Sequence, residues 1–183
     1  LVLLSYLSLE GSQQRKHLAE LFWPDGNRMK SLSMTLTRLR QGVGEVVDVD
    51  EKSAKAKLPS DAKELLESLD KSQWQRVSEL YTGAFLEGVV LEDWSSELEE
   101  WVYTTREYLA ERVQYALLNL AEEAAKLQDF NKARDHAERA YKLPGLGGTE
   151  VTNLKRLYPL LSASSSLLAP EVRKELDSYG ITV

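Results

Sequence analysis

Apolar residues in the first part of the chain recur at helical spacing and predict three short helices. The first helix ends at Gly11, because glycine is typical of helix C-caps. The second follows Ser12 as its N-cap and stops before Pro24, which cannot continue a helix comfortably. The third runs from about residue 28 to residue 41.

The third predicted helix has a sharp division between an apolar and a polar face. Its apolar stripe, which we expect to be buried, consists of Met29, Leu32, Leu36, Leu39 and Val43. The opposite face holds Lys30, Ser31, Ser33, Met34, Thr37, Arg38 and Gln41. No carboxylate occurs between Gly26 and Gly44, although the whole chain carries 29 Asp and Glu residues against 23 Lys and Arg. A basic island in an acidic chain indicates a surface with an anionic partner.

A hairpin follows the third helix. Val47 and Val49 alternate with aspartates, and a second alternating run carries Lys55 and Lys57 after a short turn. Three short helices and a hairpin are the layout of a winged helix-turn-helix, which we assign to residues 1–58. That layout does not by itself show DNA binding.

The rest of the chain, residues 59–183, reads as all-helical, so the predicted fold class is mainly α. The expected helices cover residues 61–69, 72–81, 96–127, 131–142, 150–164 and 169–181, and a glycine-punctuated loop covers residues 82–94. Ser96 and Glu99 have the spacing of a capping box at the start of the long helix.

Charge separates these two regions. Residues 1–58 hold nine Lys and Arg against seven Asp and Glu, a net charge of +2, whereas the remainder has a net charge of −8. The chain has no cysteine, which excludes disulfides and thiolate metal sites and fits a reducing cytoplasm. The opening run LVLLSYLSL is too short to span a bilayer, so we expect no membrane association. The chain begins at Leu within a helical pattern, and we expect that its natural start lies further upstream.

The segment LVLLSYLSLEGSQQRKHLAELFWPDGNRMKSLSMTLTRLRQGVG resembles the DNA-binding domain of the Streptomyces antibiotic regulatory protein family. In that family a helix ending LAELFWPD precedes a recognition helix ending L-x-R-L-R-x-x-V/L-G. The segments LYTGAFLEGVVLEDWSSELEEW, LAEEAAKLQDFNKARDHAERAYKLPG and VRKELDSYGI are similar to its bacterial transcriptional activation domain, which is built from tetratricopeptide-like hairpins. The four-stranded sheet that precedes the first helix in that family has no counterpart in this sequence.

The resemblance implies a DNA-binding transcriptional activator of the cytoplasm and nucleoid. Its third helix would read promoter repeats, and its helical domain would serve dimerisation or contact with RNA polymerase subunits. The residues expected to contact double-stranded DNA are Lys30, Ser31, Ser33, Met34, Thr37, Arg38, Arg40, Gln41, Lys55 and Lys57. Arg40 borders the apolar stripe, so a phosphate contact or an intradomain ion pair is expected there in preference to base readout. Lysines on an edge strand also serve to block aggregation.

Enzyme chemistry finds no support in the sequence. No phosphate-binding glycine loop, H-E-x-x-H motif or serine-elbow motif is present, so we expect a protein without catalytic activity, cofactor or metal. The rival to DNA binding is a tetratricopeptide-like protein-interaction or signalling module with a degenerate winged helix. The acidic balance of the chain and the missing sheet keep that alternative open.

Overall fold

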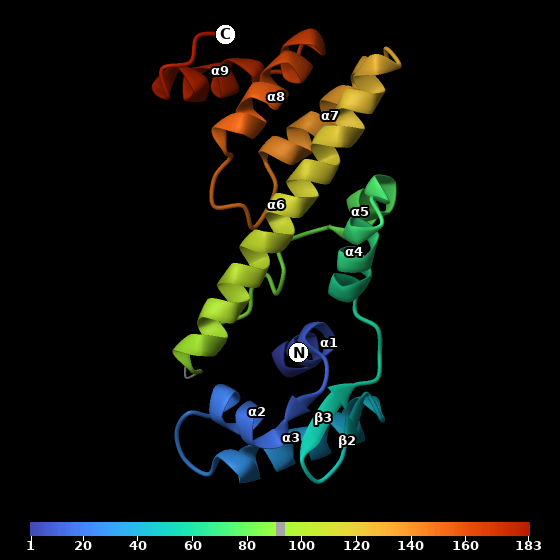
Figure 1. Ribbon diagram of the computed structural model, residues 1–183, viewed down its shortest axis with the longest axis vertical. Coiled ribbons are helices and arrows are strands. Elements are labelled where there is room, and N and C mark those ends of the chain that lie inside the picture. Colours follow the sequence, from blue (N-terminus) through green and yellow to red (C-terminus); the bar gives the residue numbers. More distant parts are fainter. Residues whose placement is uncertain (91–93) are drawn as a thin grey trace. The chain divides into compact units, whose positions relative to one another are not determined.

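The computed structural model describes residues 1–90 and 94–183, and most of these residues are helical (Figure 1). The strands of the described chain are short and form one three-stranded sheet in the order β1-β3-β2. The prediction of a mainly α protein is therefore confirmed. No helix in the described ranges combines the length and the apolar character that crossing a membrane requires.

The described chain forms two compact units, which we treat separately. The first unit comprises Leu1–Leu66 and Phe85–Thr105, and the second comprises Glu67–Ala84 and Arg106–Val183. These bounds differ from the expected boundary after residue 58. Helices α4 and α6 each have one end in the first unit and the other end in the second. Local patterns along the sequence do not predict that a continuous helix is divided in this way.

The first unit begins with three helices and the sheet. In chain order these elements are α1 (Val2–Glu10), β1 (Gln13–Gln14), α2 (Arg15–Phe22), α3 (Arg28–Val43), β2 (Val47–Val49) and β3 (Ser53–Ala56), followed by the start of α4 (Asp61–Asp70). The expected hairpin is confirmed, since β2 and β3 pair antiparallel with Val47 opposite Ala56. Gly11 closes α1 with a φ of 76°, in the left-handed region that favours glycine.

The predicted N-cap at Ser12 is wrong. The chain continues from Gly11 into strand β1, where Gln13 and Gln14 pair with β3, and α2 starts only at Arg15. A backbone that pairs with a strand is extended, so Ser12 lies too early in the chain to cap α2. Gln14 is the N-cap residue of α2, and its side chain makes no capping hydrogen bond.

The predicted apolar stripe of α3 is only partly buried. Leu32 and Leu36 enter the core, with exposed fractions of 0% and 9%, and Leu39 packs partly against it. Met29 and Val43, at the two ends of the helix, are exposed to 43% and 62%, and the prediction that they are buried is wrong. The buried part of the stripe is therefore about two turns long.

Aromatic side chains complete the core of the first unit. Tyr6 of α1 makes edge-on contacts with Phe22 of α2 and with Trp101, at ring-centroid separations of 5.8 and 4.8 Å. Trp101 also donates from Nε1 to a carboxylate oxygen of Glu10 at 2.8 Å. Trp101 is therefore a packing anchor of this core.

The described residues of the second unit form helices joined by loops and contain no strand. Beside the end of α4 the unit holds α5 (Trp74–Leu80), most of α6 (Ser96–Lys126), α7 (Phe130–Tyr141), α8 (Val151–Ala163) and α9 (Ala169–Ser178). Helix α7 packs on α8, and α8 packs on α9. Three small residues of α7 are fully buried, namely Ala133, Ala137 and Ala140. Their short side chains let α7 approach its neighbours closely.

The predicted capping box at Ser96 and Glu99 is wrong by one residue. Ser95 accepts from the backbone N–H of Leu98 at 3.2 Å, which makes Ser95 the N-cap and leaves Ser96 as the first helical residue. The third helical position is then Leu98, whose side chain cannot complete a capping box. The predicted loop over residues 82–94 includes residues 91–93, which lie outside the described chain.

Replacing Leu32 tests the buried part of α3. We expect Leu32→Ala to lower the free energy of unfolding of the first unit by about 2–5 kcal/mol, because it leaves a cavity in the core. Met29→Ala, on the same stripe but exposed, should change it by less than about 0.5 kcal/mol. Urea unfolding followed by tryptophan fluorescence measures both, since Trp23, Trp94 and Trp101 all lie in this unit. Equal changes in the free energy of unfolding for the two substitutions would show that Leu32 is not buried in the core as described.

Candidate nucleic-acid interface

Helix α3 begins immediately after a short turn and is capped by a side chain. Asn27 accepts from the backbone N–H of Lys30 at 3.3 Å, which satisfies one of the amides left free at the start of the helix. At the other end Gly44 has a φ of 82° and its amide bonds to the carbonyl of Arg40 at 3.1 Å. The sixteen-residue helix itself carries no acidic side chain.

We define the outward face of α3 as the polar face expected from the sequence. Five of its members are exposed, namely Lys30, Met34, Thr37, Arg38 and Gln41, and two are half-buried, namely Ser31 and Ser33. The five exposed positions recur at intervals of four, three, one and three residues, which keeps them on one side of the helix. The burial of Leu32 and Leu36 fixes this side toward solvent.

Two hydroxyl groups of the outward face are already engaged. Ser33 Oγ donates to the carbonyl of Met29 at 2.8 Å and accepts from Arg15 at 3.3 Å. Thr37 Oγ1 donates to the carbonyl of Ser33 at 2.8 Å but still has lone pairs to offer. Ser33 therefore serves the structure of the unit, whereas Thr37 remains able to accept a hydrogen bond from a ligand.

Arg40 forms the intradomain ion pair that was one of its two expected roles. Its Nη2 lies 2.6 Å from Glu45 Oε1, and Lys57 Nζ lies 3.3 Å from the other oxygen of the same carboxylate. Hydrogen bonds from Lys57 and from Arg40 lower the pKa of Glu45 below its ordinary value. One carboxylate thus offsets part of the charge of two residues that the sequence places among the DNA contacts.

The hairpin carries its own compensating charges. Lys55 is exposed on β3, directly across the ladder from Asp48 of β2. Opposed residues of an antiparallel pair share one face of a sheet, so these two charges are neighbours. Lys52, at the turn of the hairpin, is exposed and forms no side-chain ion pair within the described residues.

A link that the sequence did not predict connects the hairpin turn to α3. Arg15, the first residue of α2, donates from Nη2 to Ser33 Oγ and from Nη1 to the carbonyl of Asp50, each at 3.3 Å. The side chain of Asp50 in turn accepts from the amides of Lys52 and Ser53 and from Ser53 Oγ, each at 2.7 Å. These bonds, with the Ser53 hydroxyl first, lower the pKa of Asp50. The D-x-x-S spacing is a signal for such a turn, but nothing local in the sequence points to Arg15.

The outward face of α3 can thus bind an anionic surface. Lys30 and Arg38 form no side-chain ion pair or hydrogen bond within the described residues, and no acid lies on the same helix. Met34 adds an exposed apolar contact between them. Over residues 1–90 and 94–183, His, Asp and Glu side chains do not gather in the groups of three that a metal site needs.

No protein-family model, no curated protein and no solved structure matches this chain.

The shared ion pair at Glu45 can be tested by titration. Because the folded pKa is lowered, the stabilising pairing is present above the ordinary glutamate pKa and is lost as the pH falls through the folded value. We expect the carboxyl carbon of Glu45 to titrate below the ordinary range in an NMR experiment. Arg40→Met and Lys57→Met should each raise this pKa, and Lys30→Met, which removes a cation elsewhere, should leave it unchanged. An ordinary pKa in the wild-type protein would rule out the bridge.

Proposed function

We propose that this protein is a DNA-binding transcriptional regulator whose first unit acts as a winged helix-turn-helix. Helix α3 would be its recognition helix, and β2 and β3 its wing. The observation that supports this proposal best is the outward face of α3. It is held toward solvent by two buried leucines, it carries no acid, and its cations Lys30 and Arg38 have no ion-pair partner in the described chain.

The dimensions of this face suit the major groove. An α-helix with its side chains is about 10–12 Å across, close to the roughly 12 Å width of the groove in B-DNA. Lys30 and Arg38 are eight residues apart, which corresponds to about 12 Å along the helix axis at ~1.5 Å per residue. That span covers three to four base pairs at roughly 3.4 Å each.

Each exposed side chain of this face has a distinct role in the proposal. Arg38 pairs with guanine O6 and N7 or with a phosphate, and Lys30 contacts a phosphate near the start of the helix. Gln41 and Thr37 hydrogen-bond to base edges or the backbone, and Met34 contacts a thymine methyl group. Ser31 lies half-buried at the margin, where a backbone contact suits it better than base readout.

The wing contributes less charge than the sequence suggested. Glu45 is shared by Arg40 and Lys57, and Lys55 faces Asp48 across the hairpin. Lys52 is the wing lysine without an opposite charge paired to it in the described residues, and the exposed Glu51 lies beside it in the turn. We therefore assign most of the salt-dependent affinity to α3. With two or three phosphates neutralised per copy, the slope of log K against log salt would be roughly −2 to −3.

The second unit would act as a tetratricopeptide-like activation or interaction domain. Its packed helices, with buried alanines along α7, support this assignment. Such a unit could join two copies on repeated half-sites or contact RNA polymerase subunits, as the family resemblance implies. Two copies would double the salt slope of the complex.

The rival function is a protein-interaction module in which the first unit is a scaffold that binds no DNA. The observation that favours it is the compensation of cations by Glu45 and Asp48, which leaves little net charge outside α3. Salt dependence separates the two functions. DNA binding weakens steeply as salt competes for the phosphates, whereas capture of a peptide by an apolar surface barely responds.

Arg38 gives the most direct substitution test of this proposal. Against a duplex selected from a random library, we expect Arg38→Ala to weaken binding by about 1–3 kcal/mol without a change in thermal stability, because the side chain is exposed. Arg173→Ala, which removes an exposed arginine of the second unit, serves as the matched control and should leave affinity unchanged. Fluorescence anisotropy at several salt concentrations measures affinity and slope together.

The same titrations identify the kind of contact. A phosphate contact at Arg38 predicts a salt slope that is less steep by about one unit in the variant, and a base contact predicts lost discrimination at one position of the duplex. If Arg38→Ala and Arg173→Ala bind alike, the outward face of α3 is not the reading surface. If the wild-type protein binds no duplex even at low salt, the rival function stands.

A further inference from the structure

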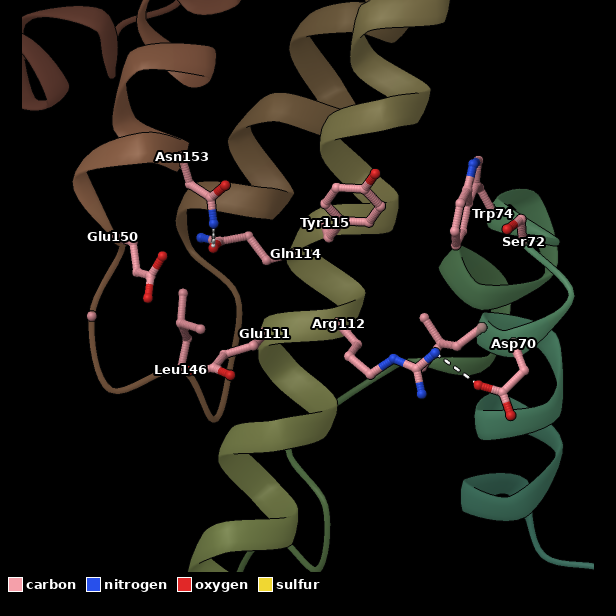
Figure 2. Close-up of a pocket in the computed structure, with 12 residues that line it drawn as sticks. Asp70, Ser72, Trp74, Glu111, Arg112, Gln114, Tyr115, Leu146, Glu150 and Asn153 are labelled. Carbon is pink, nitrogen blue, oxygen red and sulfur yellow. Dashed lines mark hydrogen bonds and ion pairs between the residues drawn. The ribbon is translucent and has the colours of Figure 1, made fainter.

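The second unit contains a solvent-accessible cavity of about 620 Å³ that the proposed DNA contacts do not use. Its lining comes from the end of α4, the start of α5, the middle of α6, the loop after α7 and the start of α8 (Figure 2). All of these residues belong to one compact unit. The volume lies in the range of about 300–1,000 Å³ that is typical of small-molecule sites.

The floor of the cavity is fixed by a buried amide. Gln114 of α6 is 1% exposed, and its Nε2 donates to the carbonyl of Ala140 at 3.0 Å and to Thr149 Oγ1 at 3.1 Å. Its Oε1 accepts from Asn153 Nδ2 at 2.7 Å. These bonds tie α6, α7, α8 and the loop between α7 and α8 together. The side-chain oxygen of Asn153, Oδ1, accepts no hydrogen bond in the described chain and remains a free acceptor.

The loop that forms one wall is held at its start. Tyr81 donates from its hydroxyl to the carbonyl of Pro144 at 2.6 Å. The next residue, Gly145, has a φ of 84°, and a Cβ atom there would lie 3.1 Å from the side chains of Ala84, Arg106 and Tyr81. Only glycine suits this close approach. The wall is therefore formed before any ligand arrives, which lowers the entropic cost of binding.

The charges of the lining are unequally compensated. Arg112 is satisfied by Asp70 at 2.8 Å and by the hydroxyl of Tyr108 at 2.9 Å, so this pair is close to neutral. Figure 2 shows Glu111 and Glu150 on the opposite side of the cavity, with Leu146 between them. Neither carboxylate has an ion-pair partner in the described chain, and Glu150 accepts only a 3.3 Å bond from Thr152. The uncompensated charge of the lining is thus negative.

The other side of the cavity is aromatic. Trp74 of α5 and Tyr115 of α6 meet edge to face with ring centroids 5.9 Å apart. Arg156 lies over the Tyr115 ring at 5.2 Å and is itself paired with Glu122 at 2.7 Å, which fixes the ring from behind. The site therefore offers two aromatic rings set edge to face, on the side opposite the two carboxylates.

We propose that this cavity binds a small organic cation, with an amine or guanidinium group on an aromatic or aliphatic body. The charged group lies on the side of the cavity that Glu111 and Glu150 line, and donates to the side-chain oxygen of Asn153. The apolar body rests on Trp74, Tyr115 and Leu146. Binding at this site does not depend on the proposed DNA contacts, which belong to the other unit.

A charge-matched series of probes tests the proposal on the full chain. We would titrate the ¹⁵N-labelled protein with 2-phenylethylamine, 3-phenylpropanol and 3-phenylpropionate, which share a ring and differ in charge. With the amine, we expect resonance shifts of the Trp74 indole N–H and of the Gln114 and Asn153 side-chain amides. The alcohol should bind at least about fivefold more weakly than the amine, and the acid should not bind. Tri-lysine, tested in parallel, represents the side chain of a basic peptide.

Conservative variants separate charge from fold. Glu111→Gln and Glu150→Gln should each weaken binding of the amine about fivefold. Glu123→Gln, which changes an exposed glutamate of α6 outside the lining, should leave the affinity unchanged. Equal binding of the three phenyl probes, no shift with the amine, or unchanged affinity in both lining variants would overturn the proposal. Tighter binding of tri-lysine than of the amine at the same resonances would also overturn it, in favour of a peptide site.

Discussion

The rotation of α3 in the first unit depends on two leucines, because Leu32 and Leu36 are the side chains of this helix that the core buries. They lie one turn apart and face α2, so the opposite side of the helix must face solvent. Both ends of the helix extend past the core, which is why Met29 and Val43 remain exposed. This narrow attachment leaves a long polar face on a helix whose orientation is nevertheless fixed.

The ion pairs around α3 then leave unpaired positive charge on that face. Arg40 and Lys57 share Glu45, and Lys55 lies across from Asp48, so the flanks of α3 are compensated inside the unit. Arg15 joins α3 to the turn that Asp50 closes, and holds the hairpin and the helix as one surface. An exposed ion pair contributes little to stability. These contacts matter here because they determine which cations remain for a ligand.

The spacing of apolar residues along the sequence predicts most of the fold but little of the candidate site. The helices and the β2–β3 hairpin follow from spacing and from glycine and proline stops. Strand β1 has only two residues and no alternating pattern, so the sequence does not reveal it. Two adjacent serines precede the body of α6, and the hydrogen bond from the Leu98 amide identifies Ser95 as the N-cap. Glu45 pairs with nearby Arg40 but also with Lys57, and only the fold shows that one carboxylate serves both. The roles of Arg15 and Gln114 depend on partners distant in sequence, so no local rule could reveal them. The cavity of the second unit cannot be predicted from local patterns either, because its lining comes from three stretches that are distant in sequence.

We propose that the outward face of α3 is the surface that meets DNA. The most direct measurement is a ¹⁵N–¹H shift map of the full chain titrated with a short duplex at low salt, repeated at high salt. We expect the largest shifts to fall on residues 28–41 and at the β2–β3 turn, and to fade as salt rises. Salt-insensitive shifts confined to the second unit, with α3 unchanged, would contradict it.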